Sequence, residues 1–235
     1  MVAFTRPGAV TRRDLLKWLA PLFVSTLSWG ARMKHVALLG DSVFDNGAYI
    51  GNGPDVAKQL RAVLGGTVEV TLAAVDGSTI SDIPGQLDRI GNASHLVISV
   101  GGNDALLQAG VLDEPVQFVT EALTRIAAIQ QEFQRAYRQM LDTVIARRLT
   151  TAVCTIYDRT AGRVGLAALN DCITREAFRH GVDLIDLRLI CNEDAVFASA
   201  IEPSVEGGAK IARAIQSFVV KPAQLHRSEV FSGPN

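Results

Sequence analysis

Short apolar runs alternate along this chain with longer stretches in which apolar residues recur at helical spacing. The runs are rich in β-branched residues and carry few polar ones, a pattern typical of strands that are buried on both faces of a sheet. We predict strands at His35 to Leu39, Val68 to Val75, His95 to Val100, Thr151 to Tyr157 and Val182 to Leu187. We predict helices at Pro54 to Leu64, Ile80 to Ile90, Val116 to Arg148, Leu166 to His180 and Gly207 to Val219.

The regular alternation of strand and helix predicts an α/β fold with a parallel sheet and helices on both of its faces. Neither an internal repeat nor a linker interrupts residues 33–220, so this stretch is expected to form one domain. The helix predicted from Val116 to Arg148 is long for a single helix, which leaves room for a bend or a break. Residues 221–235, with Pro222 near their start, read as a polar tail.

Residues 1–32 are expected to lie outside this fold. Arg12 and Arg13 precede the apolar stretch Trp18 to Trp29, which is the layout of a twin-arginine export signal whose apolar part is too short to span a bilayer. The alternative is that translation starts at Met33, directly before the first strand, and that the upstream residues belong to a mis-assigned start. The first interpretation predicts export by the twin-arginine route, and the second predicts a cytoplasmic protein.

Composition narrows the classes of partner. The chain has 235 residues, of which 48% are hydrophobic and 20% charged, as expected for a globular protein with one sizeable core. Its formal charge of −1 and its isoelectric point of about 6.4 give no electrostatic basis for binding nucleic acid or an anionic membrane. We therefore expect a small or neutral substrate and no stable membrane insertion of the mature domain. Cys154, Cys172 and Cys191 lack the spacing of metal ligands and are expected to be core thiols.

Three polar motifs follow three of the predicted strands. Gly40-Asp41-Ser42 comes directly after the first strand, Gly77 after the second, and Asn103, within Gly101-Gly102-Asn103-Asp104, after the third. Since ligands bind beyond the carboxyl ends of the strands in open parallel sheets, we expect the three loops to meet at one edge. Each motif alone is also ordinary turn chemistry, in which an aspartate caps a turn or a helix. Together they favour a binding site.

The residue types in these loops suit acyl transfer. A serine on a tight turn after a strand, here Ser42, presents its hydroxyl as a nucleophile while its backbone N–H faces the developing oxyanion. Gly77 lets the backbone approach closely and offer a second N–H, and the side-chain amide of Asn103 supplies a third donor to this oxyanion hole. Removal of one such donor typically costs on the order of a hundredfold to a thousandfold in rate.

On these residues, the stretch from about Met33 to Val220 resembles the SGNH, or GDSL-type, hydrolase superfamily of esterases, lipases, carbohydrate deacetylases and thioesterases. Ser42 matches the nucleophile of the family, Gly77 the glycine of its second motif and Asn103 the asparagine of its third. The resemblance implies a flavodoxin-like, three-layer α/β/α sandwich around five parallel strands. It also implies a small-molecule ester as substrate and neither a metal nor an organic cofactor, while the acyl group and the oligomeric state stay open.

The last motif departs from the family pattern. The family has Asp-x-x-His before a proline, whereas this chain has Ser199-Ala200-Ile201-Glu202 before Pro203. Serine thus replaces the aspartate, and glutamate replaces the histidine, of the triad that the resemblance implies. Glu202 is the economical substitute for the base, because a carboxylate within hydrogen-bond reach accepts a serine proton. The alternative for Glu202 is structural, either as a cap of the last helix or in an ion pair with Arg188 or Lys210.

Other side chains are weaker candidates for the base. His35 and His95 begin strands and His180 precedes one, so all three are expected at the opposite edge of the sheet, roughly 20 Å away. His226 reaches the site only if the tail folds back over it. Asp45, three residues after the serine, is expected to cap a local turn rather than to take part in proton transfer.

Two functions remain open from the sequence. The first is a serine hydrolase of acyl or acetyl esters, in which Glu202 is an atypical base. The second is a pseudo-hydrolase that binds an acyl or carbohydrate ligand without turnover. Retention of Ser42, Gly77 and Asn103 favours the first, because a binding protein has no evident need for three oxyanion donors. Loss of both the histidine and the aspartate favours the second.

Overall fold

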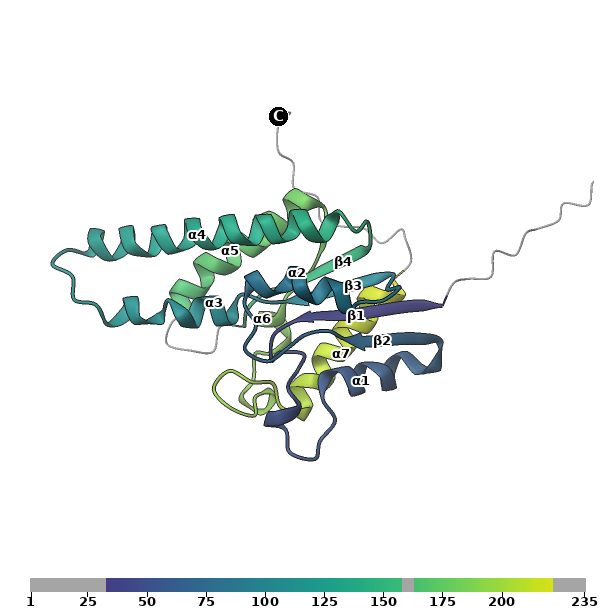
Figure 1. The fold of residues 1–235 in the computed structure, drawn as a ribbon. Coiled ribbons are helices and arrows are strands. Elements are labelled where there is room, and N and C mark those ends of the chain that lie inside the picture. Colours follow the sequence, from purple (N-terminus) through teal and green to yellow (C-terminus); the bar gives the residue numbers. More distant parts are fainter. Residues whose placement is uncertain (1–32, 158–162, 222–235) are drawn as a thin grey trace, which may run out of the picture. The chain divides into compact units, whose positions relative to one another are not determined.

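The computed structural model describes residues 33–157 and 163–221 (Figure 1). Five parallel strands form one sheet in the order β2-β1-β3-β4-β5, which confirms the predicted α/β fold with a five-stranded parallel sheet. The strands are β1 (Lys34–Gly40), β2 (Val68–Leu72), β3 (His95–Ser99), β4 (Thr150–Cys154) and β5 (Asp183–Ile185). The strand that leads into the serine motif, β1, pairs with β2 on one side and with β3 on the other, so it lies inside the sheet.

Helices cover both faces of the sheet, because alternate residues of each strand point to opposite faces. Val36 and Leu38 of β1 belong to the hydrophobic core that includes α1 (Val56–Leu64) and α7 (Val205–Val220). Ala37 and Leu39 belong to the core that includes α4 (Val119–Ile145) and α5 (Arg163–His180). The three-layer arrangement follows from this alternation.

Shorter elements fill the connections. These are the α-helices α2 (Ile83–Gln86), α3 (Gly102–Leu107) and α6 (Leu187–Ile190), and the 3-10 turns Gly47–Tyr49, Gly65–Thr67, Ile80–Asp82, Leu87–Arg89, Ala109–Asp113 and Asp194–Val196. The prediction of one helix from Ile80 to Ile90 was wrong, since this stretch forms a 3-10 turn, the short helix α2 and a second 3-10 turn. Pro84, near the start of α2, has no N–H to continue a helix from the preceding turn, so a new helix begins there.

The long helix α4 is a single helix of 27 residues, so the break considered for this stretch does not occur. Its buried side chains follow helical spacing and lie in the core with α5; they are Phe133, Tyr137, Met140, Leu141 and Val144. The first turns of α4, by contrast, expose Val119 and Leu123 to solvent. In Figure 1 these first turns, in teal, reach past the sheet on the left. The start of α4 therefore lies outside the core that the rest of the helix covers.

Several further sequence predictions concern membrane insertion, the cysteines and the two ends of the chain. None of the helices in residues 33–157 and 163–221 is both long and apolar enough to cross a membrane. Cys154, Cys172 and Cys191 are buried free thiols, as predicted. The export-signal interpretation of residues 1–32 and the predictions for His226 and the tail after Lys221 lie outside the described residues.

Candidate active site

The end of β1 runs into a turn that only glycine permits. Gly40 has a φ angle of +126°, and a Cβ atom there would lie 1.7 Å from the carbonyl oxygen of Ser99 on β3. The side chain of Gln86 accepts a hydrogen bond from the Gly40 N–H at 2.7 Å and donates one to the Gly40 carbonyl at 2.8 Å. The Asp41 N–H donates to the Ser99 carbonyl at 3.1 Å. These contacts fix the direction in which the chain leaves β1 and presents Ser42.

The side chains of Ser42 and Glu202 meet just beyond this turn. The Ser42 hydroxyl donates a hydrogen bond to Oε1 of Glu202 at 3.0 Å, although 160 residues separate the two. Both side chains are buried, with exposed fractions of 8% for Ser42 and 4% for Glu202. The other carboxylate oxygen, Oε2, has no hydrogen-bond partner among the described residues. A serine hydroxyl that donates to a buried carboxylate is arranged for proton transfer.

The loop that carries Glu202 closes on itself. Phe197 and Pro203 form an isolated antiparallel bridge, and the Ala198 N–H donates to the Glu202 carbonyl at 2.8 Å. Ser199 Oγ accepts a hydrogen bond from the Glu202 N–H at 3.3 Å. The serine that stands in place of the family aspartate therefore contacts the backbone of Glu202.

Two side chains anchor this loop to the rest of the fold. The Tyr157 hydroxyl donates to the Ile201 carbonyl, and the Tyr157 ring packs edge-on against Phe197 with 5.1 Å between ring centroids. Asn46, which is fully buried, donates to the Pro203 carbonyl at 3.1 Å and accepts from the first N–H of α1. The backbone on both sides of Glu202 is thus held in place.

The contacts considered for Glu202 as a structural residue are made by other groups. Ser204 caps α7, because its hydroxyl accepts a backbone N–H from the first turn at 3.2 Å. Arg188 forms an ion pair with the N-cap residue of α6 at 2.6 Å, and Lys210 forms one with Glu193 at 3.1 Å. Glu202 accordingly faces the serine rather than a helix end or a cation.

Burial changes the acidity of the carboxyls at this site. Loss of hydration raises the pKa of Glu202 above its usual range; the hydrogen bond from Ser42 acts against this rise, and the charge of Asp76 adds to it. Burial also raises the pKa of Asp41 to about 7, against the hydrogen bond from the Val43 N–H and with a further contribution from the charge of Glu202. A carboxyl with a raised pKa is a stronger base once it is ionised, which suits a proton acceptor.

The three predicted oxyanion donors differ in where they lie. Asn103 lines the same pocket as Ser42 and Glu202, whereas the exposed Gly77 is not among the described residues that line it. The Asn103 amide donates a hydrogen bond to the Ser78 carbonyl at 2.9 Å. The loop after β3 is thereby tied to the loop after β2, which contains Gly77.

The other candidates for the base lie elsewhere. Asp45 accepts a hydrogen bond from the Asp76 N–H at 3.0 Å, so it links the loops after β1 and β2 instead of capping a local turn as predicted. His35, His95 and His180 have polar partners of their own, and neither they nor those partners line the pocket.

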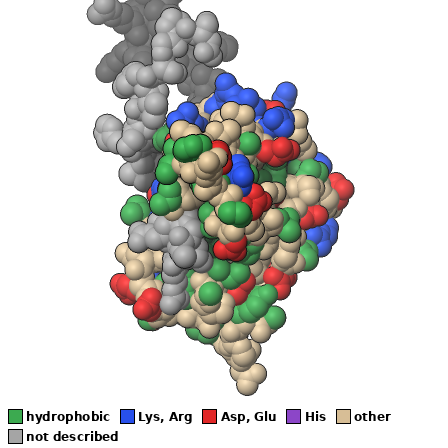
Figure 2. Space-filling model, turned by 90° about the vertical axis from the view of Figure 1, so that its left-hand side faces the viewer, with side chains coloured by type: hydrophobic (Ala, Val, Ile, Leu, Met, Phe, Trp, Pro, Cys, Tyr) green, Lys and Arg blue, Asp and Glu red, His purple; other side chains and the backbone are tan. Residues whose placement is uncertain are grey.

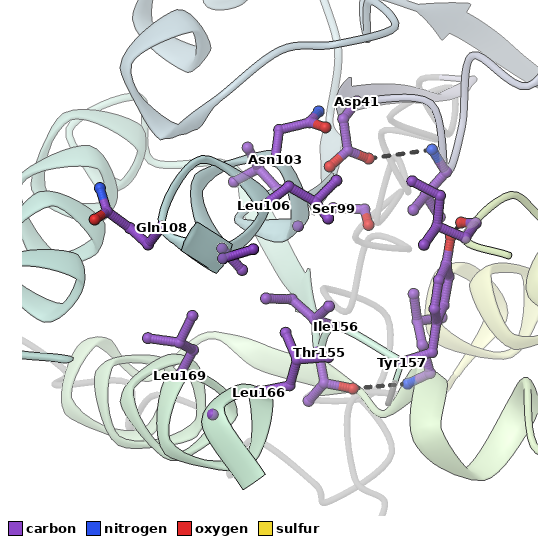
Figure 3. A pocket seen from close by; sticks show the side chains of 18 of the residues that line it. Asp41, Ser99, Asn103, Leu106, Gln108, Thr155, Ile156, Tyr157, Leu166 and Leu169 are labelled. Atoms are coloured by element: carbon purple, nitrogen blue, oxygen red, sulfur yellow. Dashed lines mark hydrogen bonds between the residues drawn. The ribbon is translucent and has the colours of Figure 1, made fainter. Parts of the chain in front are cut away.

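A pocket of about 330 Å³ adjoins Ser42, and both polar and apolar side chains line it (Figure 3). In Figure 3, Asp41, Ser99 and Asn103 lie together at one end. Leu166 and Leu169, both from α5, lie on the opposite side. Figure 3 also places Leu106 beside Ser99 and Thr155 on the side of Leu166, so polar and apolar lining residues are mixed, and α5 contributes an apolar wall opposite Asp41.

Hydrophobic side chains are also exposed near the pocket walls. Leu107, Leu112, Phe118 and Val164 are all more than half exposed. Figure 2 shows the side of the molecule that is on the left in Figure 1, where green hydrophobic side chains are interspersed with charged ones. The surface on this side is therefore mixed in character rather than continuously apolar.

Some functional features had no signal in the sequence pattern. Gln86 and Tyr157 act at a distance along the chain, and a lone glutamine or tyrosine carries no spacing signature. Asn46 lies only four residues after the serine, and that proximity was its single available signal. Among residues 33–157 and 163–221, no group of three or more His, Cys, Asp or Glu side chains is placed to hold a metal ion.

A five-stranded parallel sheet in the order β2-β1-β3-β4-β5, covered by helices on both faces, defines a flavodoxin-like α/β protein. The sequence profile of the GDSL-like Lipase/Acylhydrolase family matches residues 38–209. The chain belongs to this family, which confirms the resemblance identified from its motifs. A search of curated proteins finds no match.

Solved structures with the same fold include three hydrolases. The extracellular lipase from Streptomyces rimosus has 17% identity and a TM-score of 0.57, with 78% of this chain and 99% of that chain covered. The acetyl xylan esterase AlAXEase has 17% identity and a TM-score of 0.62, with 79% and 100% covered. Phospholipase A1 from Streptomyces albidoflavus NA297 has 16% identity and a TM-score of 0.57, with 79% and 99% covered. At these identities the likeness establishes the fold.

Proposed function

We propose that this chain is a serine hydrolase of acyl or acetyl esters in which Ser42 is the nucleophile and Glu202 is the general base. The observation that carries the proposal is the 3.0 Å hydrogen bond from the Ser42 hydroxyl to Glu202 Oε1. A positioned base accepts a proton over this distance. The names of the matched structures, two lipolytic enzymes and an acetyl xylan esterase, support an ester as the cleaved bond and leave the acyl group open.

In the first half of the reaction, Glu202 takes the hydroxyl proton of Ser42 as Oγ attacks the ester carbonyl carbon. The carbonyl π electrons move to the oxygen, and the resulting oxyanion accepts a hydrogen bond from the Ser42 N–H. When the tetrahedral intermediate collapses, the bond to the alcohol oxygen breaks and Glu202 gives its proton to the leaving alcohol. An acyl ester of Ser42 remains.

In the second half, a water molecule replaces the alcohol. Glu202 takes a proton from the water as its oxygen attacks the acyl carbon, and collapse of the second intermediate returns a proton to Ser42 Oγ and releases the acid. The unpartnered Oε2 of Glu202 is available to accept a hydrogen bond from this water while Oε1 stays directed at Ser42.

The remaining oxyanion donors are Asn103 and Gly77. A side-chain amide has two N–H donors, so Asn103 retains one for the oxyanion while the other bonds to the Ser78 carbonyl. The Gly77 N–H reaches the oxyanion only if its loop moves toward Ser42. We therefore assign Asn103 the larger share of the oxyanion stabilisation beyond that of the Ser42 N–H.

The alternative function is a pseudo-hydrolase that binds an acyl or carbohydrate ligand without turnover. The altered last motif favours it, because both the histidine and the aspartate of the family are replaced, by Glu202 and Ser199. The two functions differ in the reactivity of Ser42, which is activated in the first and inert in the second.

Labelling with a fluorophosphonate, followed by mass spectrometry of the intact protein, tests this difference. We expect stoichiometric labelling of the parent protein and none of Ser42→Ala. Glu202→Gln preserves the size of the side chain but removes the base, so labelling should slow by about a hundredfold to ten-thousandfold. Glu206→Gln is the matched control, since Glu206 is an exposed glutamate four residues along that pairs with Lys210.

Equal labelling rates for Glu202→Gln and Glu206→Gln would contradict the role of Glu202 and leave Ser42 as nucleophile. A folded parent protein that takes up no label would contradict the hydrolase and favour the pseudo-hydrolase.

A further inference from the structure

We infer that the apolar wall of the pocket opposite Asp41 binds the acyl chain of the ester, and that the acyl groups it selects have about six to ten carbons rather than two. This inference deepens the proposed function and rests on it for the identity of the reacting bond. The walls involved are those of α3, α4 and α5, and they include Leu106, Ile126, Ile129, Leu166 and Leu169.

The position of Ser42 and Glu202 fixes where the carbonyl group of an ester lies in this pocket. Ser42 and Glu202 both line it, together with Asp41 and Asn103. An ester carbonyl attacked by Ser42 accordingly has its oxygen among the hydrogen-bond donors. The acyl group then extends from the carbonyl toward Leu166 and Leu169, which lie across the pocket from Asp41 in Figure 3.

The volume of the pocket sets the size of this acyl group. At about 330 Å³ it is at the lower end of the range for small-molecule sites, which is about 300 to 1,000 Å³. A group of the size of a water molecule occupies about 30 Å³, so about ten such groups fill the space. An acetyl group leaves most of this apolar space to water, whereas a medium-length chain displaces that water.

Because these walls are apolar, each carbon of the acyl chain that they bury strengthens binding. Burial of one methylene in apolar surroundings favours binding by roughly fourfold. Octanoyl has six methylenes more than acetyl, so even partial burial favours it by well over tenfold. The wall residues Ile126 and Leu166 are half-buried, so part of each side chain is available to a ligand.

The first test compares kcat/KM for p-nitrophenyl acetate and p-nitrophenyl octanoate with the full chain. We expect octanoate to exceed acetate by at least tenfold. Leu166→Trp places an indole in the chain site, so the octanoate-to-acetate ratio should fall by at least tenfold. Val164→Trp is the matched control, because Val164 is two residues away on α5, is 82% exposed and does not line the pocket, so the ratio should stay unchanged. A parent that prefers acetate, or a ratio that is equal in the two variants, overturns the inference.

A binding measurement separates this inference from the proposed function. Isothermal titration of Ser42→Ala with methyl octanoate and with methyl acetate needs no turnover. Saturable binding of methyl octanoate but not of methyl acetate, lost when Leu166→Trp is added, supports the acyl-chain site. This result supports the site even if the parent hydrolyses no ester, and only the proposed function is then contradicted. Ester hydrolysis by the parent without binding of methyl octanoate to Ser42→Ala overturns the acyl-chain site and leaves the proposed function standing.

Discussion

At the residue scale, Asp41 couples the site to the stability of the fold. Burial raises its pKa from an ordinary value of 3.8 to about 7. Between these two pH values the folded protein therefore holds a proton that the unfolded chain has released. The stabilising contribution is complete below the unfolded pKa and is lost as the pH rises toward the folded pKa. Ionised Asp41 thus lowers the free energy of unfolding under neutral and alkaline conditions.

Asp41→Asn should remove this dependence, because the amide keeps an oxygen for the Val43 N–H and does not ionise. We expect the variant to gain stability over the parent between pH 5 and pH 8 by about 3 kcal/mol, because only the two pH units from pH 5 to the folded pKa of about 7 contribute. Urea unfolding at both pH values measures the difference. Asp88→Asn, at an exposed position, is the control and should change little. A parallel pH dependence of parent and Asp41→Asn would show that Asp41 is ionised throughout.

The residue scale also shows the limit of motif reasoning. Ser42, Asn103 and Glu202 were found from the sequence because each stands at a fixed offset from a strand end or a proline. Gln86 was not, because its role depends on α2 lying beside the end of β1, and no local pattern encodes that distance. The prediction for Asp45 failed for the same reason, since its partner, Asp76, belongs to a different loop.

At the element scale, the end of β1 depends on α2 through Gln86. Its side chain is the partner of both backbone groups of Gly40, so Gln86→Leu leaves the buried Gly40 N–H without a partner, whereas the Gly40 carbonyl keeps the hydrogen bond from the Val75 N–H at 3.0 Å. An unsatisfied buried group costs about 1 to 3 kcal/mol, and we expect a loss of about this size in the free energy of unfolding. The rate of fluorophosphonate labelling of Ser42 should fall as well, because the turn loses its fixed direction.

Chemical denaturation and labelling of the same samples measure both effects. Gln139→Leu, on the exposed side of α4, is the matched control and should leave both unchanged. An unaltered labelling rate in a destabilised Gln86→Leu would confine Gln86 to the fold and separate it from the site.

The element scale explains which parts of the fold were predictable. The parallel sheet and both helix layers follow from the alternation of β-branched runs and helical periods, because burial on two faces leaves a clear pattern; the order of the strands was not predicted. The stretch from Ile80 to Ile90 was wrongly predicted as one helix, because its apolar spacing is helical while Pro84 interrupts the backbone. The pocket walls had no comparable signal, since they depend on how far α4 and α5 reach past the sheet and on the short α3, which was not predicted.

At the scale of the whole molecule, the described sheet begins directly after the first 32 residues of the chain. Lys34 begins β1, which pairs along its length with β2 and β3. We therefore expect a chain that starts at Met33 to keep the thermal midpoint and the labelling rate of the full chain. A chain that starts at Asp41 lacks β1 and should not fold. Scanning calorimetry of the three proteins measures this, and a large loss in the Met33 chain would assign residues 1–32 to the fold.

The polarity of the pocket also bears on how the site empties. In the proposed reaction an ester enters as a neutral molecule, but the acid released by hydrolysis ionises at neutral pH and is formed in the pocket that Asp41 and Glu202 both line. Two negative charges at close range repel each other, and more strongly where water is scarce. The carboxyls that flank Ser42 therefore expel the anionic product while they tolerate the neutral substrate. Fatty acids should for this reason be poor inhibitors, and increasingly so as Asp41 ionises.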